Sequence, residues 1–319
     1  MTEGCTKQGC VITGVAGFVG SHLAERLLAM GCTVVGVDNF FSGRWENMAS
    51  LQKNPAFTFY ELDINEPGLL ERLKGSHPQV SYCFHLAAVV SVLYSMDHPE
   101  ETLETNYRAT VRLLNEADLL GFKGFVFAGS AAEYGDDQRI PLLEEYATEE
   151  ETHHLSPYGR AKFLASREVA ANSIGVALRF FNIYGPGQDP RSPYSGVISR
   201  FIDMARDGRA LTVFGDGLQT RDFVYVSDVV DAYIRAAGLE REKMIPHGVY
   251  NTGTGKSSTI LELANVIREI FGSSSELQFL PGRHGDILHS LARVDKFRKT
   301  AGWSARVSLL EGLRKTVGQ

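Results

Sequence analysis

One segment of the sequence places a tyrosine and a lysine at a spacing that could support proton transfer. Tyr158 and Lys162 lie four positions apart in SPYGRAK (residues 156–162), so a helix would project both side chains from one face. A free tyrosine has a pKa of about 10 and is a poor base at neutral pH. A neighbouring ammonium would lower that pKa and favour a phenolate that can take a proton from an alcohol. Ser130, at the end of the strand-like run FVFAGS, could share the proton. A solvated pair on a surface helix is the alternative, because this spacing is common by chance.

Three glycines near the start of the chain have the spacing of a phosphate-binding turn. Gly14, Gly17 and Gly20, in TGVAGFVGSHL, follow the first predicted strand and open a helix. The first glycine permits a tight turn, the second lets the backbone approach a pyrophosphate, and the third allows close packing of helix on strand. The helix N-terminus adds free N–H groups and a positive dipole. For the glycines taken alone, a plain turn is the alternative.

Two acidic residues at strand ends extend this pattern into a dinucleotide site. Asp38 ends the second predicted strand, about 20 residues further on, where a carboxylate can accept the ribose hydroxyls of an adenosine. Because that carboxylate would repel a 2′-phosphate, we expect NAD rather than NADP, and the nicotinamide cation would help to lower the pKa of Tyr158. Asp63 ends the third strand. It could reach the adenine, or it could cap a helix with Glu66 three residues later, and the sequence favours neither.

Strand-like and helix-like segments alternate through the first half of the chain, which predicts an α/β fold with a Rossmann-type doubly wound parallel sheet. The alternation breaks after residue 182. We expect an NAD-binding domain over residues 1–181, rejoined by 222–250, and a smaller α/β substrate lobe over most of 182–319. The predicted strands span 10–13, 33–38, 57–63, 80–88, 124–129, 176–182, 212–214 and 223–226. The predicted helices span 21–30, 99–120, 157–173, 197–207, 229–237, 257–271 and 309–317.

Composition excludes several classes of protein. The 319 residues are 44% hydrophobic and 22% charged with a net charge of -6, which predicts an ordinary globular protein and argues against a nucleic-acid or anionic-membrane partner. The N-terminal segment has no basic region followed by an apolar region, so we expect no secretory signal. The uncharged stretch 78–96 is too polar to span a membrane. The 4 cysteines are scattered, so we expect no disulfide framework, no metal site and a cytoplasmic location.

The order and spacing of many motifs resemble the extended short-chain dehydrogenase/reductase superfamily. Within it, the chain is similar to the nucleotide-sugar epimerases and dehydratases, of which the UDP-glucose 4-epimerases are an example. The resemblance covers almost the whole chain. It is carried by TGVAGFVGSHL, VDNFFSGRWEN, ELDI, FHLAA, FVFAGSAAEYG, SPYGRAK, LRFFNIYGPGQDP, VFGDGLQTRDFVYVSDVVDA, YNTGTGKSSTILELA, GRHGDI and GWSARVSLLEGLRKTV.

The resemblance implies a role for each residue that matches a family motif. Ser130, Tyr158 and Lys162 would form the catalytic triad. The NAD-binding residues would be Gly14, Gly17, Phe18, Val19, Gly20, Asp38, Asn39, Phe40, Ser42, Gly43, Asp63, Ile64, Leu86, Ala87, Ala88, Asn106, Ala128, Tyr158, Lys162 and Phe180. The substrate-binding residues would be Ser130, Tyr158, Asn182, Val197, Thr212, Phe214, Arg221, Arg283 and Asp286, with the two guanidiniums suited to a diphosphate.

Two alanines next to Ser130 indicate which member of the family the chain resembles. Dehydratases carry an aspartate and a glutamate at the positions of Ala131 and Ala132, and methyl groups cannot move protons. Glu133 lies one position further and is expected to point away from the site. Elimination is therefore disfavoured, and a 4-epimerase acting on a UDP-hexose, hexosamine or uronate is the expected activity. Other enzymes that oxidise C4, such as UDP-glucuronate decarboxylases and dTDP-glucose dehydratases, stay open, as does a non-catalytic NAD-binding regulator. Polysaccharide biosynthesis is the kind of pathway the expected activity would serve.

The resemblance also implies an assembly. The predicted helices over 99–120 and 157–173 are similar to the pair that forms a four-helix dimer interface in this family, so we expect a homodimer. Val15 replaces a glycine that is common in the first turn, which requires a negative φ at this residue.

Overall fold

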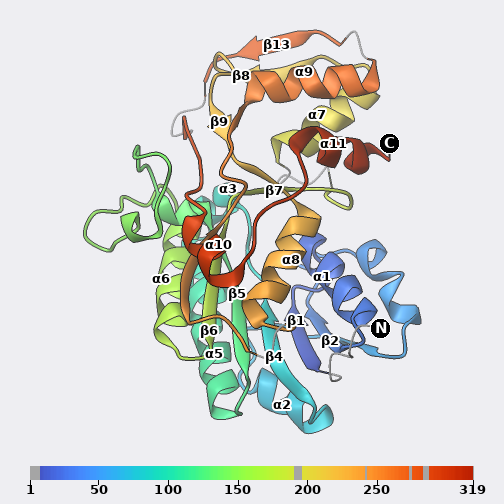
Figure 1. Cartoon of the computed structure of the whole chain (residues 1–319), viewed down its shortest axis with the longest axis vertical. Helices are drawn as coiled ribbons and strands as arrows, with labels where there is room; N and C mark the ends of the chain where they lie inside the picture. Colours follow the sequence, from blue (N-terminus) through green and yellow to red (C-terminus); the bar gives the residue numbers. More distant parts are fainter. Residues whose placement is uncertain (1–7, 190–195, 241–242, 273–274, 283–286, 319) are drawn as a thin grey trace.

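A seven-stranded parallel sheet forms the centre of the larger lobe (Figure 1). The computed structural model describes residues 8–189, 196–240, 243–272, 275–282 and 287–318. The strand order is β11-β6-β5-β4-β1-β2-β3, and the chain reverses its direction of winding between β1 and β4. This confirms the predicted doubly wound α/β fold. The strands are β1 (Gly9–Thr13), β2 (Thr33–Asp38), β3 (Phe57–Glu61), β4 (Val80–His85), β5 (Gly124–Ser130), β6 (Gly175–Phe180) and β11 (Gly248–Thr252).

Helices cover both faces of this sheet, and alternate strand residues supply the two cores. Cys10 and Ile12 of β1 join one hydrophobic cluster, which includes residues of α1 and α8. Val11, between them, joins the cluster on the opposite face, with residues of α2, α5 and α6. Burial on both faces explains why these strands read as continuous apolar runs. The covering helices are α1 (Phe18–Ala29), α2 (Leu69–Ser76), α5 (Ala109–Leu119), α6 (Pro157–Ala171) and α8 (Val226–Ala237).

A smaller lobe lies above the carboxyl ends of the strands in the view of Figure 1. Its own hydrophobic cluster joins α7, α9 and α11 to the parallel pair of β8 and β13. There are two further short pairs, β7 with β10 and β9 with β12, and the first pair contributes Tyr184, Phe223 and Tyr225 to the same cluster. The elements are β7 (Asn182–Tyr184), α7 (Val197–Arg206), β8 (Leu211–Phe214), β9 (Thr220–Arg221), β10 (Phe223–Tyr225), β12 (Ser258–Thr259), α9 (Ile260–Phe271), β13 (Leu277–Leu280) and α11 (Leu309–Val317). The helix α10 (Asp295–Ala301) instead packs in the core of the larger lobe.

The helix predicted over 99–120 is interrupted. It consists of α4 (Pro99–Leu103), a π-helical turn (Glu104–Arg108) and α5. The wider turn contains Asn106, whose side chain accepts from the backbone N–H of Val89 and donates to its carbonyl, both at 2.8 Å. Such turns frequently lie at functional sites. The strand predicted over 176–182 is also divided, because Phe181 leaves the sheet between β6 and β7.

Within residues 222–250, α8 packs on the main sheet and β11 pairs with β6. The division into two domains stays a prediction.

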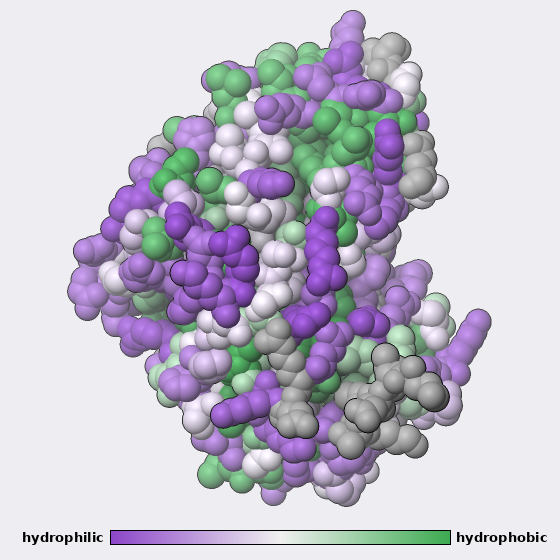
Figure 2. Space-filling view, viewed as in Figure 1, coloured by the Kyte–Doolittle hydropathy of each residue, from purple (hydrophilic) through white to green (hydrophobic). Residues whose placement is uncertain are grey.

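Polar residues cover most of the face in Figure 2, with more hydrophobic side chains near the small lobe. Within the described part of the chain, no helix is both long and apolar enough to cross a bilayer.

Candidate active site

The turn between β1 and α1 has the geometry that the three glycines predict. Gly14 has a φ of +76°, and a Cβ there would lie 2.7 Å from the backbone nitrogen of Ala87. A Cβ on Gly20 would lie 2.1 Å from the carbonyl oxygen of Gly14, so only glycine allows the helix to approach the strand. Val15 has the negative φ that a residue other than glycine requires here. Phe40 is the one non-glycine residue with positive φ in the described part of the chain.

An open cavity of about 730 Å³ lies over this turn at the carboxyl edge of the sheet. Strand ends at a point where the winding reverses form the usual dinucleotide crevice of such folds. The residues predicted for the cofactor that line the cavity are Gly14, Gly17, Phe18, Val19, Gly20, Asp38, Asn39, Ser42, Asp63, Ile64, Leu86, Ala87 and Ala88.

The two strand-end carboxylates face this cavity. Asp38 is 7% exposed, and its oxygens accept from the backbone N–H groups of Ala16 at 2.9 Å and Phe40 at 2.8 Å. Burial raises the pKa of Asp38, while these hydrogen bonds lower it. Asp63 accepts from Asn39 Nδ2 at 3.0 Å. It does not cap a helix, because the N-cap of α2 is Gly68. The glycine cradle and a carboxylate held at the ribose position fit a bound NAD.

The other residues predicted for the cofactor do not line the cavity. Phe40 stacks on Trp45, with ring centroids 5.0 Å apart. Asn106 holds the backbone of Val89, which does line the cavity. A Cβ on Gly43 would lie 2.7 Å from an oxygen of Asp38, so this glycine allows the loop after β2 to close on the carboxylate. The remaining ones are Ala128, Tyr158, Lys162 and Phe180.

Several cavity residues were not expected from the sequence. Arg44 and Asp189, which follow β2 and β7 in the chain, line the cavity and form an ion pair at 3.3 Å. Because Arg44 follows the DNFFSG motif closely, the sequence could have suggested that its loop lines the cofactor cavity. Asp189 is far from that motif in the sequence and reaches the cavity only through the fold. The unexpected lining residues are Phe41, Arg44, Asn47, Leu62, Asn65, Val89, Val90, Glu101, Thr105, Ile183, Gly187, Gln188 and Asp189.

The start of α6 positions the tyrosine and the lysine. Ser156 caps the helix by accepting from the backbone N–H of Gly159 at 3.1 Å, and Pro157 occupies the first helical position. Tyr158 therefore lies in the first turn and Lys162 one turn later on the same face, as predicted. The backbone N–H of Tyr158 also donates to Ser95 at 3.2 Å, which ties α3 (Val92–Asp97) to this turn.

Ser130 lies close enough to Tyr158 for its hydroxyl to lower the pKa of the phenol. Burial is the larger effect and raises that pKa, and the carboxylate of Glu133 raises it further. Burial lowers the pKa of Lys162 to about 8, which Glu133 opposes. The chain's own groups therefore raise the pKa of Tyr158, contrary to the expectation from the sequence. Lys162 donates to the Ala128 carbonyl at 2.9 Å, so its charge is directed to the end of β5.

The residues predicted for the substrate are spread over several elements of the small lobe and its junction with the sheet. Asn182 begins β7, Arg221 ends β9, and Val197 begins α7. Thr212 and Phe214 are half-buried on β8. Arg283 and Asp286 lie outside the described residues.

The sequence analysis did not single out Asp222, which is next to Arg221. This fully buried carboxylate accepts from Thr254 N at 2.8 Å, Gly255 N at 3.0 Å and Ala292 N at 3.2 Å.

The parallel sheet, the glycine turn and the cavity above it define a dinucleotide-binding α/β protein. A family described as the NAD dependent epimerase/dehydratase family matches residues 10–253. The chain belongs to this family, which confirms the resemblance seen in the motifs and identifies NAD as the cofactor.

Similar proteins include both epimerases and decarboxylases. The UDP-glucose 4-epimerase of Mycolicibacterium smegmatis is 37% identical, over 96% of this chain and 96% of that protein. UDP-glucuronic acid decarboxylase 2 of Arabidopsis thaliana is 35% identical, over 95% of this chain and 66% of that protein. Among solved structures, UDP-glucose 4-epimerase with UDP-glucose from Thermotoga maritima has a TM-score of 0.87 and 35% identity, covering 97% of both chains.

Proposed function

We propose that this protein is an NAD-dependent nucleotide-sugar 4-epimerase that inverts C4 of a UDP-hexose, hexosamine or uronate. The observation that carries the proposal is the placement of Ser130 at the end of β5, close to Tyr158, with Lys162 one turn further along α6. The neighbouring strand β4 leads directly into residues 86–90, which line the dinucleotide cavity. A regulator that only senses NAD needs the cradle but no hydroxyl pair for moving a proton.

The chain's residues would act in three ways. Tyr158, as a phenolate, takes the proton of the C4 hydroxyl, and Ser130 shares it. Because burial raises the pKa of this phenol, the positive charge of a bound nicotinamide ring is needed to offset that cost. NAD, when bound, supplies the acceptor and later the donor of the hydride at C4. Arg221 and Arg283 hold the diphosphate while the 4-keto sugar turns over and presents its other face.

The end of β5 supports epimerisation over elimination. Ala131 and Ala132 carry no acid or base, and Glu133 is fully buried in an ion pair with Arg179. No carboxylate of this segment is therefore free to remove a proton from the sugar. The decarboxylase relative gives a specific reason to keep a second candidate, the loss of CO2 from a UDP-glucuronate oxidised at C4.

A product assay separates these candidates. We expect incubation with a panel of UDP- and dTDP-hexoses, hexosamines and uronates to give a C4 epimer of unchanged mass, identified by NMR. Tyr158→Phe should abolish turnover, about 10²–10⁴-fold, while NAD binding stays largely intact. A product lighter by CO2 or water would replace the proposal with one of the alternatives. Substantial epimerisation by the Tyr158→Phe variant would remove Tyr158 from the mechanism.

Two further properties are part of this proposal. We propose a cytoplasmic enzyme, because the 4 cysteines are scattered along the sequence without the spacing of a disulfide framework. We also propose a homodimer through a four-helix bundle, because α5 and α6 pack together on one face of the sheet as adjacent helices. Light scattering of the purified protein gives the molecular mass in solution that tests the second point.

A further inference from the structure

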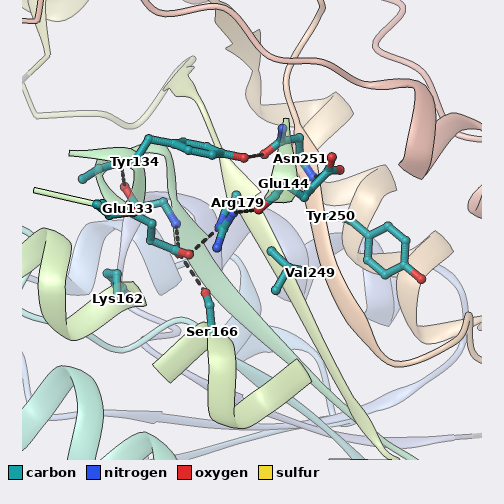
Figure 3. A network of polar contacts seen from close by, with 12 residues as sticks. Glu133, Tyr134, Glu144, Lys162, Ser166, Arg179, Val249, Tyr250 and Asn251 are labelled. Carbon is teal, nitrogen blue, oxygen red and sulfur yellow. Dashed lines mark hydrogen bonds and ion pairs between the residues drawn. The ribbon is translucent and has the colours of Figure 1, made fainter. Parts of the chain in front are cut away.

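A carboxylate lies directly behind the proposed catalytic serine. Glu133 has no exposed surface, and its Oε1 accepts from the backbone N–H of Ser130 at 2.8 Å and from Ser166 Oγ at 2.8 Å (Figure 3). The serine side chain in turn accepts from the N–H of Ala132 at 3.2 Å, which completes a capping box around the 3₁₀ turn of residues 131–134. The same carboxylate therefore fixes the backbone that carries the serine.

Arg179 of β6 holds the other oxygen of this carboxylate. Its Nε contacts Glu133 Oε2, its side chain is 3% exposed, and a second nitrogen donates to the Glu144 carbonyl at 2.9 Å. The guanidinium also lies 4.9 Å from the centroid of the Tyr134 ring. Figure 3 shows the carboxylate between the guanidinium and Ser166, with Lys162 on the same side as Ser166. The position of Glu133 is thus fixed from three elements, β5, α6 and β6.

The backbone leaves room for this carboxylate. A Cβ on Gly129 would lie 2.7 Å from Glu133 Oε1 and 3.1 Å from Ser166 Oγ, so any other residue would push the carboxylate away from the strand end. The ion pair of Glu133 and Arg179 is expected to add little to the free energy of unfolding, because the cost of desolvating two buried charges commonly offsets their attraction. Apolar residues of similar volume would fill the same space. A role in positioning accounts better for the pair.

We propose that Glu133 is a positioning residue of the site, which anchors Ser130 through its backbone and supplies the buried negative charge that Lys162 and Tyr158 experience. The proposal deepens the epimerase function and rests on it. Ser130, Tyr158 and Lys162 would touch substrate or cofactor, whereas Glu133 acts through them. Its carboxylate stays behind the strand end and takes no part in proton transfer.

The charges around these groups fix the direction of the expected effect. Glu133 raises the pKa of both Tyr158 and Lys162, so its removal lowers both. Arg179 from β6 faces the carboxylate, and Tyr134 from the 3₁₀ turn and Glu144 from the next turn contact this guanidinium. Tyr233 from α8 faces Tyr158, and His85 from β4 faces Lys162. His85 stays neutral, because burial lowers its pKa to about 3.

Glu133→Gln is the direct test, because it keeps the size and the acceptor for Ser130 but removes the charge. In the NAD-loaded enzyme we expect the acidic limb of the kcat profile to move to lower pH by about one unit. The absorbance titration of the Tyr158 phenol, taken as the difference from a Tyr158→Phe variant of the same background, should shift equally. A purely structural role would lower kcat at every pH and leave both midpoints in place, and that result overturns the proposal.

Two further variants keep the test decisive. Tyr134→Phe removes a buried hydrogen bond of 2.6 Å to Asn251 but leaves Glu133 intact, so it should lower stability without moving either midpoint. If Glu133→Gln does not fold, Glu133→Gln combined with Arg179→Met removes both buried charges. This double variant should show a smaller shift in the same direction, because no unpaired guanidinium adds to it. The phenol titration needs no turnover. A shifted midpoint in a protein that epimerises nothing supports the positioning role and overturns the epimerase proposal instead. If the enzyme epimerises its substrate but the midpoint does not shift, the epimerase proposal is supported and the positioning role of Glu133 is overturned.

Discussion

Lys162 places a full positive charge in a site that the chain otherwise keeps neutral. Its side chain is 3% exposed, and burial lowers its pKa to about 8. Glu133, which opposes this shift, is itself paired with Arg179, so it offsets the charge of the ammonium only in part. Such a charge destabilises the fold and is kept where chemistry needs it.

Lys162→Met should therefore give a more stable but inactive protein. The folded-state pKa lies below the unfolded value of 10.5, so the unfolded chain binds more protons between about pH 8 and 10.5, and wild-type stability rises with pH across that window. We expect the variant to be more stable by about 1–3 kcal/mol at pH 7, with the gain shrinking above pH 8. Guanidinium unfolding at pH 7 and pH 10 measures this difference. A variant that is less stable at pH 7 would show that the bond to the Ala128 carbonyl outweighs the charge.

At the scale of the element, the first turn of α6 carries the chemistry. The cap by Ser156 satisfies the N–H of Gly159, and Tyr158 lies between these two residues. Fraying of this turn would move the phenol before it affected the rest of the helix.

Ser156→Ala should lower stability by about 1 kcal/mol and reduce kcat more than it changes KM. Ser308→Ala is the matched control, because Ser308 caps α11 in the same way, accepting from Glu311 N at 3.3 Å, far from the cavity. We expect similar losses of melting temperature in both variants and a loss of kcat only in the first. Equal kcat values at a temperature where both are folded would contradict this account.

The elements that the sequence predicted well are those with long apolar periodicity. β2 and α11 have the predicted bounds, and the other main strands and helices differ mainly at their ends. β11, α2 and α10 were missed, being short and recognisable mainly by their packing on longer elements. The glycine turn and Asp38 follow from local spacing. Glu133 does not, because its partner Arg179 is 46 positions away and a tertiary ion pair leaves no local pattern.

At the scale of the molecule, an ion pair between Arg44 and Asp189 joins two segments that line the cavity, one after β2 and one after β7. Arg44 belongs to the loop after β2, and its Nη2 also donates to the Gly187 carbonyl at 3.4 Å. The Arg44 and Asp189 side chains are 39% and 31% exposed, so their ion pair adds little to folding stability. Its effect should instead fall on whatever lies in the cavity beneath it.

Arg44→Ala should weaken NAD binding about fivefold while leaving the melting temperature almost unchanged, since an exposed pair is worth up to about 1 kcal/mol. Calorimetric titration with NAD measures the affinity. Arg293→Ala is the control, because Arg293 pairs with Asp295 on the surface away from the cavity. Equal NAD affinity in both variants would mean that the Arg44 pair does not retain the cofactor.

The order of strands also has a consequence for biosynthesis. The outermost strand beside β6 is β11, which the ribosome delivers only after the whole segment from β7 to α8. At about 5–20 residues per second, the hydrogen-bonding edge of β6 stays bare for on the order of ten seconds. An uncovered edge of this kind is a template for pairing with other nascent chains. Translation that stalls between β6 and β11 should therefore leave a fragment that depends on chaperones to stay dispersed.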